Sequence, residues 1–106
     1  MDINLALKVS DKDNVATIFA EIAANSKVEV RDKKGESEII TAFNDIPYGH
    51  KIAVVDIAVG EEIFKYGEEI GVATKEIKKG DYVHVHNLDS MRGRGDLPKN
   101  KKIGGE

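Results

Sequence analysis

Apolar residues alternate with polar or small ones at the start of the chain. An apolar side chain stands at every second position from Ile3 to Val9, and this period of two predicts a first strand over residues 3–9. After a polar segment that offers helix N-caps, the spacing becomes helical, with alanines between the apolar residues Val15, Ile18, Phe19 and Ile22. This spacing predicts one short amphipathic helix over residues 14–24.

The rest of the chain has the pattern of a mainly β domain. Val28 and Val30 alternate with charged residues, residues 32–35 are a predicted turn, and residues 37–43 are the expected return strand of a hairpin. Residues 51–57 are the most apolar stretch and predict a buried strand. Short segments follow, separated by glycines that we expect to take positive φ in turns: Gly60, Gly67, Gly71 and Gly80. We identify no internal repeat, and the short strands predict a compact, curled β-domain.

The size and composition of the chain limit what it can be. Its 106 residues are enough for one domain with a modest core, so we expect an enzyme of this size to need a second chain to close its site. The formal net charge of −3, with both signs interspersed, gives no electrostatic case for binding nucleic acid or an anionic membrane. The absence of cysteine excludes disulfides, thiolate metal sites and thiol nucleophiles. No secretion signal or long apolar run is seen, and we therefore expect a cytoplasmic protein.

The character of the chain changes near its C-terminus. From Asp89 onward the sequence is rich in glycine and basic residues and has little to bury. We therefore divide the chain into a domain over residues 1–88 and a tail or docking segment over residues 89–106.

The three histidines are the main candidates for chemistry. His84 and His86 are two residues apart, and on a strand they would share one face, about 7 Å apart, with Val83 and Val85 on the other face. His50 follows a predicted glycine turn. Imidazole is a common metal ligand and transfers protons near neutral pH. The alternative is that the pair belongs to a half-exposed polar strand face without chemistry.

Three segments carry a resemblance to a known family. They are Ile-Pro-Tyr-Gly-His-Lys-Ile-Ala at residues 46–53, Ile-Phe-Lys-Tyr-Gly-Glu-Glu-Ile-Gly at 63–71 and Val-His-Val-His-Asn-Leu at 83–88. In this order they resemble the amino-terminal domain of the altronate dehydratase family, which also occurs as a separately encoded small subunit. The same pattern is found in galactarate dehydratase and in the small subunit of sulfolactate sulfo-lyase. Residues 57–63 are similar to the core of the SAF domain, a β-clip fold.

The resemblance implies a lyase component with an SAF-like β-clip fold. Members of the family remove water from six-carbon sugar acids to give a 2-keto-3-deoxy acid, or remove sulfite from sulfolactate to give pyruvate. The dehydratases depend on a divalent metal, Fe²⁺ or Mn²⁺, which we expect a large subunit to hold for the most part. The implied partners are that large subunit and a sugar-acid substrate, and self-association stays open.

The resemblance also assigns roles to individual residues. His84, His86 and His50 are the candidate catalytic residues, because elimination beside a carboxylate needs a base for the C–H proton and an acid for the departing hydroxide. His84 and His86 are alternatively candidate metal ligands. Lys51 and Lys65 are the candidate substrate-binding residues, each as a point charge for a carboxylate. The alternative is a solvated strand lysine, which is favoured for each of them taken singly.

Three questions stay open at this stage. Tyr66 either donates its hydroxyl or packs against a turn, and packing is favoured. Asn87 either orients a histidine or ends the strand. The chain is either the small subunit of a lyase or a non-catalytic β-clip module that binds a small carboxylate or regulates a partner, and the sequence does not separate altronate, galactarate and sulfolactate as substrates.

Overall fold

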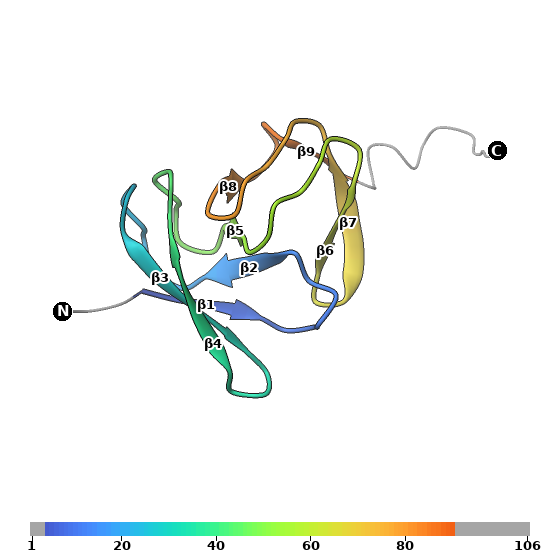
Figure 1. Ribbon diagram of the computed structural model, residues 1–106. Coiled ribbons are helices and arrows are strands. Elements are labelled where there is room, and N and C mark those ends of the chain that lie inside the picture. The colour runs from blue at the N-terminus through green and yellow to red at the C-terminus, as the bar shows by residue number, and fades with distance from the viewer. Residues whose placement is uncertain (1–3, 91–106) are drawn as a thin grey trace, which may run out of the picture.

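Short strands with turn-forming residues between them fold into two sheets (Figure 1). The computed structural model describes residues 4–90. The larger sheet has six strands, in the order β4 (Ser37–Thr41), β3 (Lys27–Asp32), β1 (Asn4–Lys8), β2 (Val15–Ile18), β5 (Lys51–Ala53) and β8 (Tyr82–Val83). The smaller sheet has the order β6 (Glu62–Lys65), β7 (Glu68–Ala73) and β9 (Leu88–Ser90). Neighbouring strands are antiparallel except for the parallel pair β1 and β3.

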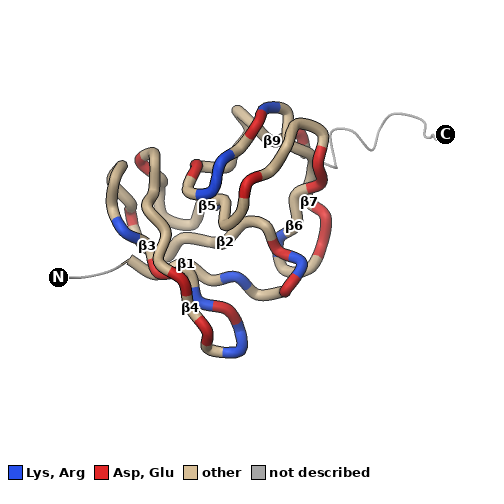
Figure 2. The backbone as a smooth tube through the Cα atoms, in the orientation of Figure 1, with Lys and Arg blue, Asp and Glu red and all other residues tan. Residues whose placement is uncertain are grey.

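The mainly β class is confirmed, but the helix predicted over residues 14–24 is wrong. The segment contains β2, and the four residues of this strand are all buried. A strand that is buried on both faces loses the alternation of polar and apolar residues, so its sequence is easily mistaken for a helix. Figure 2 shows β2 as an uncharged segment near the middle of the molecule. The described residues form no helix, and hence none of the length and apolarity needed to cross a membrane.

One short backbone unit occurs four times in the described residues, which corrects the expectation of no internal repeat. Each copy begins with a buried isoleucine: Ile22, Ile46, Ile57 and Ile77. Three residues later the chain takes a positive φ, at Asn25, Gly49, Gly60 and Gly80. Three residues further on stands a fully buried β-branched residue: Val28, Ile52, Ile63 and Val83. The repeat is hard to see in the sequence because it is short and an asparagine replaces the glycine in its first copy.

The four turns have the same internal hydrogen bond as well as the same residue spacing. In each copy the last turn residue donates its N–H to the carbonyl of the first, as in a type II turn, with 3.1 Å for His50 to Pro47 and 2.9 Å for Asp81 to Lys78. The isoleucines also pair with each other, Ile22 with Ile46 and Ile57 with Ile77. The repeats therefore form two pairs, and each pair contributes to one of two apolar clusters.

Gly71 does not take the turn conformation expected for it. Gly60, Gly67 and Gly80 have the predicted positive φ, whereas Gly71 lies within β7. A Cβ atom at Gly71 would come within 2.3 Å of the backbone oxygen of Asp89 on β9. Glycine is thus required here for the close approach of two strands. The domain boundary predicted at residue 88 falls within β9, and the predicted tail beyond Ser90 lies outside the described residues.

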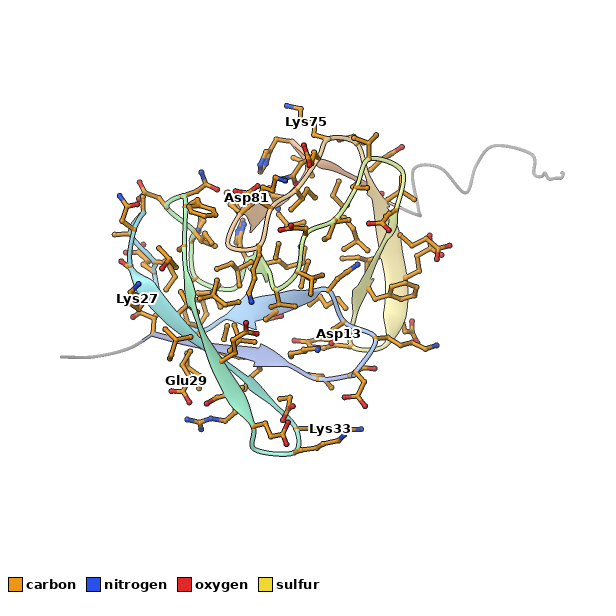
Figure 3. All side chains as sticks on the ribbon, viewed as in Figure 1. Asp13, Lys27, Glu29, Lys33, Lys75 and Asp81 are labelled. Atoms are coloured by element: carbon orange, nitrogen blue, oxygen red, sulfur yellow. The ribbon has the colours of Figure 1, made fainter. Side chains whose placement is uncertain are left out.

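Two adjacent residues between β1 and β2 attach the β6–β7 hairpin to the larger sheet. The buried carboxylate of Asp13, labelled in Figure 3, accepts the N–H groups of Val9 and Ser10 through Oδ2 and that of Gly67 through Oδ1, at 2.8–3.1 Å. Asn14 accepts the N–H of Phe64 and donates its side-chain amide to the carbonyl of Glu62, at 2.8 and 2.9 Å. We call this pair the Asp13–Asn14 clip.

Removing the Asp13 carboxylate should therefore destabilise the domain. Asp13→Ala leaves three backbone N–H groups without their acceptor, and we expect a loss of about 3 kcal/mol in the free energy of unfolding. Asp11→Ala is the matched control, because Asp11 is exposed and its contact with Lys34 is a long surface ion pair of 3.6 Å. Urea unfolding of both variants measures the difference, and equal stabilities would contradict the role given to the clip.

Candidate functional site

The three histidines lie around one tyrosine, Tyr82. The Nδ1 atom of His50 is 2.6 Å from the Tyr82 hydroxyl. The ring of His84 is stacked parallel to that of Tyr82, with 5.7 Å between centroids, and the His86 ring lies 5.3 Å from it. The rings of His50 and His84 are 4.6 Å apart. We call these four residues the histidine group.

Strand pairing brings His50 to the other two histidines. In the antiparallel pair of β5 and β8, Ile52 is opposite Tyr82 and Lys51 is opposite Val83. Continuing this register by one residue places His50 opposite His84. The backbone carbonyl of His50 also accepts the N–H of Ile18 on β2, at 2.9 Å, which fixes the end of the turn. Long-range pairing thus assembles the group from two repeats of the backbone unit.

His84 and His86 do not share the face of a strand, so this part of the sequence prediction is wrong. Strand β8 ends at Val83, the chain turns over the next four residues, and Val85 is 77% exposed instead of facing the core. The cause is Asn87, which is buried. Its side chain accepts the N–H of His84 and donates to the carbonyl of Tyr82, both at 2.9 Å. Of the two roles considered for Asn87, ending the strand is the one observed.

Tyr82 is a member of the site that the sequence reasoning missed. It is half-buried, packs against the first apolar cluster and contacts all three histidines. Its position just after a glycine turn, two residues before His84, is the same place relative to the turn that Lys51 has after Gly49. The alignment of the four turns is the signal that could have revealed it.

Lys51 and Lys65 meet in a second set of residues beside the first. Lys51 lies directly opposite Thr17 of β2, while Lys65 ends β6 with its Nζ atom 4.9 Å from the centre of the Tyr66 ring. The Tyr66 hydroxyl is 3.3 Å from Oγ1 of Thr17. Tyr66 is half exposed and contacts Thr17 and Lys65 in addition to its own turn. We call Thr17, Lys51, Lys65 and Tyr66 the lysine group.

The two groups influence each other electrostatically. Partial removal from water lowers the pKa of His84, and the nearby charges of His50, Lys51 and His86 lower it further. Burial likewise lowers the pKa of Lys51, with a smaller contribution from the charge of Lys65. No carboxylate among residues 4–90 is within ion-pair distance of either lysine. The neutral form of His84 is therefore favoured near pH 7.

The histidine group does not by itself fit a metal ion. No set of three or more histidine and carboxylate side chains in the described part of the chain is arranged as a metal site. Nδ1 of His50 is already engaged with Tyr82, which leaves fewer imidazole nitrogens free for coordination. Metal ligation by His84 and His86 stays a prediction, and no step of the chemistry below depends on it.

Comparisons with known proteins give one consistent result. The family model described as "Altronate/galactarate dehydratase SAF domain" matches residues 4–91. The chain is 38% identical to altronate dehydratase of Escherichia coli over 98 residues, covering 86% of this chain and 19% of that protein. It is 45% identical to the alpha subunit of (2R)-sulfolactate sulfo-lyase of Chromohalobacter salexigens over 47 residues, covering 44% of this chain and 50% of that subunit. Galactarate dehydratase (L-threo-forming) of Escherichia coli is 35% identical over 77 residues, 73% of this chain and 14% of the enzyme. The chain thus spans only a fifth to a half of its first two relatives.

The electrostatic environment of His84 predicts how it titrates. We expect its imidazole to take up a proton below the ordinary value of 6.5, and the pKa to rise in Lys51→Met, which keeps an apolar stem but removes one nearby charge. His84 binds a proton less readily in the folded than in the unfolded state. Its contribution to the free energy of unfolding is therefore fully present above pH 6.5 and is lost as the pH falls below that value. NMR titration of the imidazole signals measures the His84 pKa in the wild type and in Lys51→Met. An unchanged His84 pKa in Lys51→Met would contradict the coupling.

Proposed function

This chain belongs to the SAF-domain family of altronate and galactarate dehydratases, and we propose that it is the small subunit of a sugar-acid dehydratase, eliminating water together with a large subunit. The observation that supports this most is the meeting of His50, His84 and His86 around Tyr82, beside two lysines that have no carboxylate partner among residues 4–90. The product of such a reaction is a 2-keto-3-deoxy acid.

The histidine group has the chemistry that elimination requires. A neutral imidazole removes the proton from the carbon next to the carboxylate, the C–O bond at the neighbouring carbon breaks, and the hydroxide leaves as water with a proton from a second imidazole. The resulting enol then becomes the keto acid. The lowered pKa of His84 favours its neutral form near pH 7, which is the form that accepts a proton. Lys51 and Lys65 supply positive charge for the carboxylate, on which negative charge increases during the reaction.

The open position of the site supports the need for a larger partner. Val85 lies between two of the histidines and is largely exposed, so the described residues do not exclude water from this turn. The relatives named as dehydratases contain several times the length that this chain covers, and one named relative is a subunit of a lyase. We propose that a large subunit closes the site and holds most of the ligands of the expected Fe²⁺ or Mn²⁺.

Two other assignments share this site. The first is the elimination of sulfite from sulfolactate, favoured by the similarity to the sulfo-lyase subunit. The second is a non-catalytic module that binds a small carboxylate or regulates a partner, favoured by the two lysines, whose positive charges suit an anion without help from the histidines. Loss of turnover in histidine variants separates a lyase from a binding module.

The histidine variants test the proposal when the chain is combined with a large dehydratase subunit. We expect His84→Ala and His86→Ala each to lower altronate turnover by ~10²-fold or more, the scale of a lost acid or base. His50→Ala should have a smaller effect, because its ring also serves the hydrogen bond to Tyr82. The chain alone should show almost no turnover.

Lys33→Ala is the control for these variants, because Lys33 is exposed near the end of the β3–β4 hairpin (Figure 3). It should keep full turnover. Thermal melts of the free chain should move little in the His86 variant, because His86 is exposed. They should move only modestly in the His84 variant, which loses contacts with the Tyr82 and His50 rings but no place in the apolar clusters. Full turnover by both variants would leave the binding module as the better assignment.

A further inference from the structure

The turn between β6 and β7 has an unfavourable residue at its first position. Lys65 and Glu68 are paired across the hairpin, so the loop consists of Tyr66 and Gly67 alone. Both have positive φ, 58° and 81°. This is the type I′ pattern, for which asparagine followed by glycine is strongly preferred. A tyrosine with a left-handed backbone costs stability, and such strain is a reason to look for a function of the side chain.

The strained turn holds the Tyr66 side chain against other members of the lysine group. Its hydroxyl is 3.3 Å from Oγ1 of Thr17, and its ring lies 4.9 Å from the Lys65 ammonium. Thr17 is only 6% exposed and stands opposite Lys51 in the sheet. Two hydroxyl residues and two lysines from three segments of the chain therefore lie close together here. An asparagine in the same turn is too short to make these contacts.

The charges of the lysine group are not balanced within the described chain. Glu68 is opposite Lys65 in the hairpin, yet the two are not within ion-pair distance. The carboxylate of Asp13 lies close to the turn, but both of its oxygens accept backbone N–H groups. Two neighbouring cations that have no acidic partner within residues 4–90 favour an anionic ligand.

We propose that the lysine group is a carboxylate-binding site contained entirely in this chain, and that Tyr66 keeps its strained position because its hydroxyl serves that site. Lys51 and Lys65 provide the charge. One of the two hydroxyls donates its hydrogen to the oxygen of the other. The accepting hydroxyl keeps its own hydrogen, which is free to bond a carboxylate oxygen of the ligand. A sugar acid is the ligand class, and its identification as the substrate of a dehydratase rests on the function proposed above. Binding itself does not depend on that function.

Titration of the full chain with gluconate tests the site directly. Gluconate is a six-carbon sugar acid, and we expect saturable shifts of the amide NMR signals of Thr17, Lys51 and Lys65–Gly67, with a Kd of about millimolar. Sodium chloride at equal ionic strength controls for general charge, and sorbitol controls for the neutral polyol. Inorganic phosphate tests the alternative anion. Shifts that do not saturate, or tighter binding of phosphate than of gluconate, would overturn the assignment.

Substitutions of Tyr66 separate binding from folding. Tyr66→Asn introduces the residue that the turn prefers, so its Tm should rise while its affinity for gluconate falls at least 5-fold. Tyr66→Phe keeps the ring and loses the hydroxyl, so its affinity should also fall, without the gain in Tm. Tyr48→Phe is the matched control, because Tyr48 is an exposed tyrosine that contacts Phe19 edge-on, and it should bind as the wild type does.

The possible failures can be told apart. Wild-type affinity in Tyr66→Asn would show that the tyrosine is not part of the site, and a lower Tm in that variant would show that the turn is not strained. Gluconate binding together with full turnover in the His84 and His86 variants would overturn the proposed function but not this site. Absence of gluconate binding together with loss of turnover in those variants would overturn this site but not the proposed function.

Discussion

The Asp13–Asn14 clip is the interaction on which the rest of the structure depends most. A buried carboxylate is costly unless hydrogen-bond donors surround it, and Asp13, a residue only 4% exposed, meets this condition with three backbone N–H groups. One of them belongs to Gly67, so the same carboxylate joins the β1–β2 turn to the β6–β7 hairpin. Asn14 makes a second connection to the same hairpin, through the backbone of Glu62 and Phe64 on β6. The Tyr66 hydroxyl reaches Thr17 because this hairpin is held against the larger sheet.

The fourfold turn explains how so small a domain carries two groups of polar residues. Its buried isoleucines and its glycine or asparagine are fixed by the backbone, whereas the last turn residue is free to vary among Ser26, His50, Glu61 and Asp81. The next residue after each turn begins or adjoins a strand, and two of these positions hold Lys51 and Tyr82. The scaffold therefore sets where side chains stand, and the residue types at a few turn positions decide the chemistry.

The parts of the fold that follow from local sequence were predictable, and those that depend on distant partners were not. The β3–β4 hairpin and the turns at Gly60 and Gly80 follow from local residue preferences. The motif segments also identified the five candidate side chains, although nothing in the sequence placed them in two groups. Burial of β2 on both faces removed the alternation that would have marked it as a strand. The turn at His84 depends on side-chain bonds of Asn87, and Gly71 is required by a strand that pairs from eighteen residues further along the chain.

The neighbouring lysine and histidine groups have a chemical consequence for the proposed reaction. Partial burial lowers the pKa of His84, and the positive charges around it, including that of Lys51, lower it further, so the neutral form of this base is favoured near pH 7. A carboxylate bound between the lysines cancels part of that charge and raises the affinity of His84 for a proton. Substrate binding would then strengthen the base at the moment when it must accept a proton from carbon, while the lysines remain in place for the charge that develops on the carboxylate. A pair of lysines that finds no acidic partner in the described part of the chain thus suits both recognition of the acid and proton transfer from it.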